Sequence, residues 1–209
     1  MLSSKNIILV HGAGLCGLEM LVLKKRLLNK GFNVFLFRYS YYFDGLDSNA
    51  HKLKKFIEMN NIQNGNFVCH SLGGIVALKF LVNNPSYQFS SIVNLATPHN
   101  GSKIVRGILK LPFGFLIVGK TLSEFHQDLF EFDHIKNLAV IAGTVNFILG
   151  YLFALPSPND TVLSRRDVKP DHSNHYRAVT ATHASILFSK KAFNLILEFI
   201  DNKSFIVKS

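Results

Sequence analysis

Short runs of apolar residues alternate with segments of helical periodicity, and this alternation constrains the fold more than any other feature of the sequence. A strand that is buried on both faces of a parallel sheet reads as a continuous apolar run. Such runs predict strands at residues 7–10, 34–37, 67–69, 92–95, 138–142 and 176–180. Periodicity predicts helices over residues 18–28, around 53–57, over 75–82 and over 193–200. This order predicts an α/β fold, a mostly parallel sheet with helices on both faces.

The whole chain of 209 residues is expected to form one domain. A chain of this length buries one good core, and residues 1–209 contain no internal repeat, linker or low-complexity segment. Two apolar stretches, residues 103–130 and 145–157, interrupt the alternation. Both fit either cap or lid segments over a site or ordinary core helices. The helix around residues 53–57 is expected to be capped by Asp47 or Ser48.

The chain is strongly basic, with 23 Lys and Arg against 13 Asp and Glu and a formal net charge of +10. Such an excess favours nucleic acid, an anionic membrane surface or an acidic substrate as the partner. The basic residues are scattered over the polar faces of predicted helices, and no RNA-binding signature or zinc-finger cysteine spacing is present. Nucleic acid is therefore not expected as a partner, whereas peripheral contact with an anionic membrane surface stays open.

The two cysteines, Cys16 and Cys69, do not form a Cys-x-x-Cys pair. This pattern argues against a disulfide framework and favours a reducing compartment. The first residues lead directly into a predicted strand, which leaves no room for a signal peptide, and no uncharged stretch is long enough to span a bilayer. We therefore expect a cytoplasmic protein, with or without peripheral membrane contact.

The most informative local motif is the turn that contains Ser71. The apolar strand 67–69 leads into His-Ser-Leu-Gly-Gly at residues 70–74 and then into an apolar helix. So sharp a turn holds the serine side chain at the carboxyl edge of a sheet, above a helix N-terminus that stabilises negative charge. The motif is close to Gly-x-Ser-x-Gly, with Cys69 in place of the first glycine. The alternative is a glycine-rich turn with an incidental serine.

A serine hydroxyl needs a general base to act as a nucleophile near neutral pH, and the base needs a third group to orient it. Two later histidines, His99 and His183, lie on turn-like loops. His183, between the last predicted strand and the last helix, is the preferred base, and His99 is expected to hydrogen-bond its own loop. Asp160, in a loop before the last strand, is the preferred acid. Asp167 and Asp171 are close enough in sequence to be alternatives.

Five short motifs follow one another along essentially the whole chain. They are Val-His-Gly at residues 10–12, His-Ser-Leu-Gly-Gly at 70–74, Thr-Pro-His-Asn-Gly-Ser at 97–102, Asn-Asp-Thr-Val at 159–162 and Thr-His at 182–183. On these motifs the chain resembles small lipases and esterases of the α/β-hydrolase superfamily, and is similar to compact bacterial lipases. The hexapeptide resembles the Thr-Pro-His-x-Gly-Ser segment that is common after a strand in lipases.

This resemblance implies a catalytic triad and an α/β-hydrolase fold. In the triad, Ser71 is the nucleophile, His183 the base and Asp160 the orienting acid. The resemblance also implies an oxyanion hole formed by the backbone N–H groups of Leu72 and Ala13, with the following glycine, residue 14, as the alternative to the latter.

No cofactor is implied by the resemblance, and no metal is expected. His172 and His175 have a His-x-x-His spacing, but the sequence shows no third ligand beside them.

The implied activity is hydrolysis of acyl or lipid esters through an acyl-enzyme intermediate. A thioesterase or an amidase would use the same triad. A different class of function is a catalytically inactive hydrolase fold that serves as a binding module, because fold does not establish function. Apolar segments 103–130 and 145–157, if they line the site, favour long acyl chains. The sequence carries no signal for the oligomeric state or the natural substrate.

Overall fold

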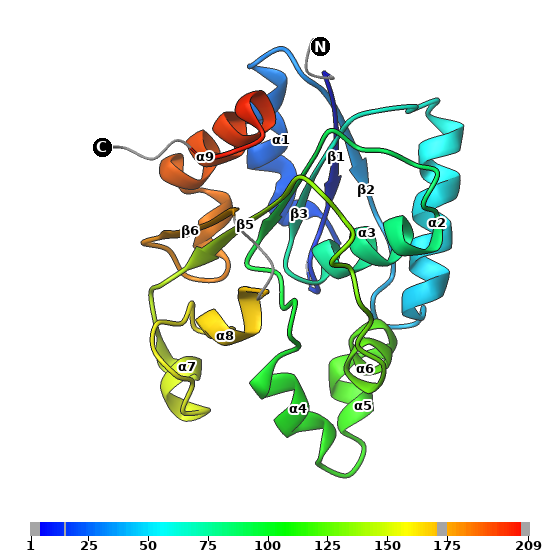
Figure 1. Cartoon of the computed structure of the whole chain (residues 1–209). Helices are drawn as coiled ribbons and strands as arrows, with labels where there is room; N and C mark the ends of the chain where they lie inside the picture. The colour runs from blue at the N-terminus through cyan, green and yellow to red at the C-terminus, as the bar shows by residue number, and fades with distance from the viewer. Residues whose placement is uncertain (1–4, 15, 171–174, 206–209) are drawn as a thin grey trace.

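A computed structural model of the chain describes residues 5–14, 16–170 and 175–205 (Figure 1). Its sheet consists of the strands β1 (Asn6–Val10), β2 (Asn33–Phe37), β3 (Asn66–His70), β4 (Ser91–Leu95), β5 (Leu138–Gly143) and β6 (His175–Val179). Their order is β2-β1-β3-β4-β5-β6, and all neighbouring strands in this sheet are parallel. The predicted α/β fold is therefore confirmed, and all six predicted strands are present.

Four long helical segments cover the two faces of the sheet, as predicted (Figure 1). One face carries η1 (Leu18–Met20) with α1 (Leu21–Leu28) and α9 (Lys190–Asn202). The other face carries α2 (Leu46–Met59) and α3 (Leu72–Asn83). The sequence predicted one helix where η1 and α1 follow each other, because their apolar residues share a single period.

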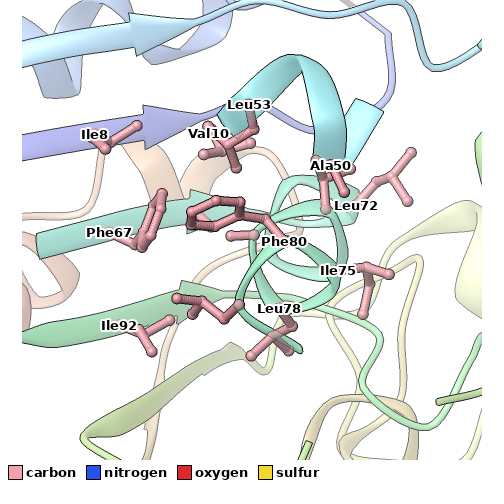
Figure 2. Close-up of a cluster of buried hydrophobic side chains, with 14 of the residues drawn as sticks. Ile8, Val10, Ala50, Leu53, Phe67, Leu72, Ile75, Leu78, Phe80 and Ile92 are labelled. Atoms are coloured by element: carbon pink, nitrogen blue, oxygen red, sulfur yellow. The ribbon is translucent and has the colours of Figure 1, made fainter. Parts of the chain in front are cut away.

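Successive strand residues point to opposite faces and divide the core into two layers. In β1, Ile8 and Val10 pack with α2 and α3, whereas Ile7 and Leu9 pack with α1 and α9. Figure 2 shows the first layer, in which Phe80 of α3 lies against the strands. Each such large apolar side chain contributes roughly 1.5–3 kcal/mol on burial. The core therefore holds the central strands rigidly and fixes where their carboxyl ends lie.

The remaining helices lie beyond the carboxyl ends of the strands (Figure 1). They are α4 (Lys103–Leu109), α5 (Gly114–Val118), α6 (Lys120–Gln127), α7 (Ile148–Leu152) and α8 (Arg165–Val168). The short helix η2 (Ser185–Leu187) precedes α9 and places Ile186 and Leu187 in the core. The stretches 103–130 and 145–157 thus form short helices at this edge and not long core helices. No helix within the described residues is long and apolar enough to cross a membrane.

The predicted cap of α2 is wrong. The helix begins at Leu46, one residue before Asp47. Its N-cap residue is Gly45, which has no side chain that could cap the helix. The Leu46 N–H donates instead to the Glu124 carboxylate of α6, at 2.6 Å. A Cβ on Gly45 would come 2.4 Å from that carboxylate, so glycine is needed for the close approach. This contact also fixes α6 against the sheet-covering helices.

Candidate active site

Ser71 lies between β3 and α3 in a backbone conformation that residues other than glycine rarely adopt, with φ 50° and ψ −125°. Such a conformation costs on the order of 1–3 kcal/mol and persists only where the surroundings enforce it. Here the Ser71 N–H donates to Leu95 O at 2.8 Å. Gly73 is required because a Cβ there would lie 2.3 Å from the Val10 carbonyl oxygen. The strained turn presents the Ser71 hydroxyl at the carboxyl edge of the sheet, next to the N-terminus of α3.

Cys69 occupies the position where a glycine is usual in this type of turn. Its side chain is fully buried in the core layer below α3, so the sulfur packs as an apolar group and does not obstruct the turn. Burial raises the pKa of the Cys69 thiol, which keeps the thiolate form unpopulated near neutral pH. Cys69 is therefore not poised as a second nucleophile.

His183 joins Ser71 to Asp160. Its Nε2 atom lies 2.9 Å from Ser71 Oγ, and its Nδ1 atom lies 2.8 Å from Asp160 Oδ2. A carboxylate only accepts, so Nδ1 carries the proton and Nε2 is free to accept from the serine hydroxyl. The loop after β6 places His183 there, and the His183 N–H also donates to the Asp160 carbonyl oxygen at 2.7 Å.

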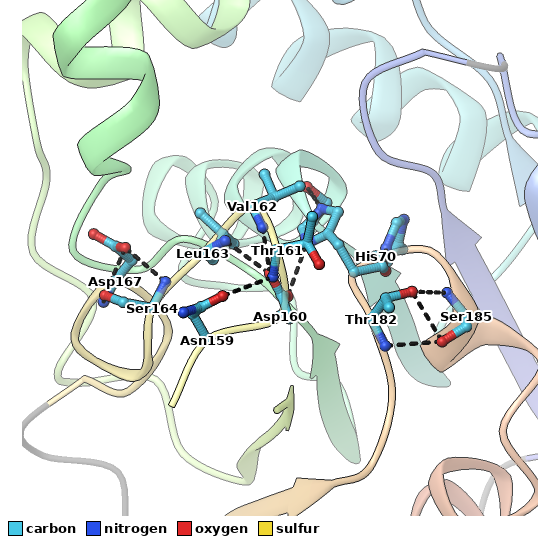
Figure 3. A network of polar contacts seen from close by, with 12 residues as sticks. His70, Asn159, Asp160, Thr161, Val162, Leu163, Ser164, Asp167, Thr182 and Ser185 are labelled. Atoms are coloured by element: carbon cyan, nitrogen blue, oxygen red, sulfur yellow. Dashed lines mark hydrogen bonds and ion pairs between the residues drawn. The ribbon is translucent and has the colours of Figure 1, made fainter. Parts of the chain in front are cut away.

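Asp160 is held by the turn that it begins (Figure 3). Its Oδ1 atom accepts from the N–H groups of Val162 at 3.0 Å and Leu163 at 2.7 Å. The Asp160 N–H in turn donates to Leu163 O at 3.0 Å and closes the turn. One carboxylate oxygen is thus committed to the backbone, which leaves Oδ2 directed at His183.

The alternative acids do not take this place. Asp167 lies in α8, where its Oδ2 atom accepts from the N–H and the hydroxyl of Ser164, both at 2.8 Å, in a capping box (Figure 3). Its Oδ1 atom lies 3.5 Å from the Arg106 guanidinium. Asp171 lies outside the described residues. Of the described candidates, the structure brings Asp160 to His183.

Two backbone N–H groups, those of Leu72 and Ala13, belong to segments that adjoin Ser71. Leu72 is the first residue of α3, and its N–H, like every N–H of a first helical turn, has no acceptor within the helix. The loop after β1 passes directly over the serine, since a Cβ on Gly12 would lie 3.0 Å from Ser71 Cβ. Ala13 follows in this loop and is exposed.

His11 fixes the orientation of the peptide that precedes Ala13. Its Nε2 atom accepts from the Tyr39 N–H at 3.2 Å, so Nδ1 donates to Gly12 O at 2.6 Å. Burial lowers the pKa of His11 and keeps the ring neutral, as this pattern requires. A peptide unit is planar and trans, so the Ala13 N–H points away from the held carbonyl. The sequence pattern Val-His-Gly did not by itself reveal this lock.

His70, the residue before Ser71, supports the loop of His183. Its Nε2 atom donates to the His183 carbonyl oxygen at 2.9 Å. Burial, and secondarily the neighbouring His183, lower the pKa of His70 to about 3, so the ring is neutral. The two partners of this bond are 113 residues apart, and no local sequence signal identifies it.

Among the described residues, no group of His, Cys, Asp and Glu side chains is arranged to hold a metal ion. His172, one half of the His-x-x-His pair, lies outside the described residues. His175 lies in β6, and its ring contacts Phe199 and Phe205.

Comparison with known proteins places this geometry in a fold family. No protein-family model and no curated protein sequence matches the chain. Solved structures do match: the mature lipase BlEst2 of Bacillus licheniformis has 16% identity and a TM-score of 0.74, over 98% of this chain and 94% of that one. The metagenomic carboxyl esterase MGS0156 has 15% identity and a TM-score of 0.67, over 96% and 76%. Phospholipase PlaB of Legionella pneumophila has 13% identity and a TM-score of 0.63, over 95% and 59%.

At such identities the likeness establishes the fold. The protein has the α/β-hydrolase fold, as the sequence motifs predicted. The three similar proteins are described as a lipase, a carboxyl esterase and a phospholipase.

Proposed function

We propose that this protein is a serine hydrolase that cleaves carboxylic esters through an acyl-enzyme intermediate. The observation that carries the proposal is the continuous hydrogen-bond chain from Ser71 Oγ through His183 to Asp160, with distances of 2.9 Å and 2.8 Å. This is the arrangement that a serine nucleophile needs, with a base in contact and an acid holding the base in the correct tautomer.

In the first half-reaction, His183 Nε2 takes the Ser71 proton while Oγ forms a bond to the ester carbonyl carbon. The tetrahedral intermediate collapses, the carbon–alkoxide bond breaks, and the proton on Nε2 passes to the leaving alcohol. In the second half-reaction, His183 Nε2 takes a proton from water, whose oxygen forms a bond to the acyl carbon. The second tetrahedral intermediate collapses, the bond between that carbon and Ser71 Oγ breaks, and the proton on Nε2 returns to Oγ as the acid is released.

The negative charge of each tetrahedral intermediate is assigned to the N–H groups of Leu72 and Ala13. One belongs to the start of α3, and the other is oriented by the His11 bond to Gly12 O. Loss of one such donor typically costs about 3–4 kcal/mol of transition-state stabilisation.

The surroundings of the site favour an apolar acyl group or a lipid as substrate. Large apolar side chains are exposed on α5 and α7, at the edge of the sheet that carries Ser71 (Figure 1). Phe113, just before α5, is 71% exposed and Leu152 of α7 is 73% exposed. Exposed apolar groups of this kind mark contact with a partner or a lipid surface. In this proposal residues 1–209 form one domain, with 103–130 and 145–157 as its cap segments.

The charge of the chain favours an anionic lipid surface as the contact of this edge. Lys110 and Lys120 are exposed and flank α5 in sequence, exposed Lys103 donates to Ala154 O just after α7, and the net charge is +10. The chain contains no tryptophan, so Leu152→Trp introduces a single indole. We expect its fluorescence to shift to the blue with phosphatidylglycerol vesicles and less with phosphatidylcholine vesicles. Met59→Trp, at an 83% exposed position where α2 ends, is the control. Equal behaviour of the two variants would exclude this membrane contact.

Labelling with a fluorophosphonate probe tests the proposed hydrolase activity. We expect folded wild-type protein to label at Ser71 and the Ser71→Ala variant not to label. Folded wild-type protein that fails to label would refute the hydrolase proposal and leave a binding module as the function of the fold.

A series of p-nitrophenyl esters of increasing acyl length tests whether the substrate is apolar, and a preference for acetate over longer acyl groups would contradict that proposal. Matched thioester and anilide substrates distinguish an esterase from a thioesterase or an amidase.

A further inference from the structure

The hexapeptide at residues 97–102 contributes no group to the triad, yet it contacts the serine turn and α8, the helix that follows the turn of Asp160. It begins two residues after the end of β4 and ends at Ser102, whose hydroxyl accepts from the Val105 N–H and caps α4. The segment therefore leads from the carboxyl end of β4, near the centre of the sheet, to the short helices outside it (Figure 1).

At its first residue the hexapeptide packs against the serine turn. Thr97 is fully buried, and a Cβ on Gly74 would come 2.3 Å from Thr97 Oγ1. Gly74 lies three residues after Ser71, in the first turn of α3. The start of the hexapeptide is thereby fixed relative to the nucleophile.

At its middle the hexapeptide binds the end of α8. The Asn100 side-chain amide donates to Arg166 O at 2.7 Å and to Lys169 O at 3.0 Å, and the Asn100 N–H donates to Asp167 O at 3.0 Å. His99 Nδ1 adds a bond to Val168 O at 2.6 Å. Carbonyl groups at a helix end lack partners within the helix. Two consecutive residues of the hexapeptide supply four bonds to them.

The other end of α8 continues from the turn that holds Asp160. Ser164, the N-cap residue of α8, forms a bridge with Asn159, and the Arg165 N–H donates to Pro158 O at 3.0 Å. The turn that supplies the donors to Asp160 Oδ1 lies between these two bridging residues. Movement of α8 therefore moves the backbone that aims Asp160 at His183.

We propose that Asn100 is a positioning residue, which holds α8 and thereby keeps Asp160 aligned with His183. The inference rests on the proposed hydrolase function. It deepens that function by assigning the hexapeptide the task of keeping the serine turn and the acid turn in register. Asn100 touches neither substrate nor the reacting atoms. Its side chain is exposed, so truncation leaves no cavity in the core.

The test compares Asn100→Ala with Asn60→Ala. Asn60 is also exposed, and its side chain donates to Phe56 O at 2.8 Å at the end of α2, before β3 begins and therefore at the opposite edge of the sheet. We expect Asn100→Ala to lower kcat for a p-nitrophenyl ester roughly 10- to 100-fold, because small misplacements of catalytic groups cost that much. KM is expected to change little. Asn60→Ala is expected to keep the wild-type kcat.

A spectroscopic measurement separates positioning from general loosening. The Nδ1 proton between His183 and Asp160 gives a downfield resonance in histidine-labelled protein, assigned by its absence in His183→Ala. We expect Asn100→Ala to weaken or lose this resonance and Asn60→Ala to retain it. Asn100→Asp keeps the shape but not the donors, and should behave like Asn100→Ala.

Two results would overturn the inference: a folded Asn100→Ala variant with wild-type kcat and an intact resonance, or an Asn100→Asp variant that equals wild type. Failure of the hydrolase proposal looks different. In that case wild-type protein shows the resonance but neither labels nor turns over esters. The effect of Asn100→Ala on the resonance then still decides whether the hexapeptide supports the Asp160–His183 bond.

Discussion

Asp160 and Asp167 lie seven residues apart and are almost equally buried, with 1% and 4% of their surfaces exposed. Each commits one carboxylate oxygen to nearby N–H or O–H groups of its own turn. They differ in the second oxygen, which faces His183 in Asp160 and Arg106 in Asp167. Burial and local capping are therefore common to both aspartates, and the two candidate acids differ in the group that the second carboxylate oxygen faces.

The largest effect is expected from Asp160→Asn. The two N–H groups that bind Oδ1 orient the amide so that its NH₂ group faces His183 Nδ1. His183 must then present its other tautomer, with a proton on Nε2, and cannot accept the Ser71 proton. A loss of about 10⁴-fold in kcat is typical of this change. Steady-state kinetics checks it, with circular dichroism as the control for folding. A near-normal kcat would remove Asp160 from the triad.

The next effect is a pH dependence of the free energy of unfolding, and it concerns His70 and not the two aspartates. Unfolded His70 takes up a proton as the pH falls through its ordinary pKa of 6.5, whereas burial lowers the folded pKa to about 3. The unfolded state therefore binds more protons between these values, and the free energy of unfolding falls as the pH falls. The slope reaches about 1.4 kcal/mol per pH unit.

His70→Gln tests this source of acid sensitivity. The glutamine amide can keep the bond to the His183 carbonyl but does not titrate, so the fall in stability between pH 7 and pH 5 should be smaller than in wild type. Urea unfolding at the two pH values measures it, and His51→Gln, at an exposed position of α2, is the control. If wild type and His70→Gln lose equal stability, His70 is not the group responsible.

A smaller effect is expected from Ser164→Ala. This substitution changes the surroundings of Asp167, whereas the Ser164 side chain forms no bond with the Asp160 carboxylate. The Ser164 hydroxyl donates to Asp167 Oδ2 and accepts from the Asp167 N–H. Loss of such an N-cap costs roughly 0.5–2 kcal/mol of stability. Urea unfolding measures the cost. Because the bonds of Asn100 to the end of α8 remain, kcat should stay close to the wild-type value. A loss of kcat as large as that of Asp160→Asn would mean that Asp167 serves the catalytic histidine.

The fold and the position of Ser71 could be predicted because their signals are local. Apolar strands and the Ser-x-Gly-Gly turn are continuous in sequence, and Gly73 and Gly74 mark places where any Cβ would collide with a neighbouring strand or loop. The choice between Asp160 and Asp167 could not be made in the same way. Both are turn aspartates, and the deciding contacts come from His183 and Arg106, which are distant in sequence.

Contacts between residues distant in sequence also explain the wrong prediction for the cap of α2. The cap of α2 is supplied by Glu124, 78 residues after the Leu46 N–H that it binds, so a search for a local Asp or Ser cap found the wrong residue. The partner of His70 is likewise remote. Long-range polar contacts of this kind leave no periodic pattern, whereas buried strands and helices do.

The smallest effect is expected from Asp167→Asn, the direct counterpart of Asp160→Asn. The amide oxygen can still accept from the Ser164 N–H, so the cap of α8 survives, and only the contact with Arg106 is lost. Arg106 is half-exposed and its closest approach is 3.5 Å, so the loss is worth about 1 kcal/mol or less. A double-mutant cycle with Arg106→Gln isolates this contact and should give a coupling of that size. The kcat of Asp167→Asn should remain near wild type, because the carboxylate that faces His183 is untouched. If Asp167→Asn instead abolishes turnover while Asp160→Asn does not, the roles of the two aspartates are reversed.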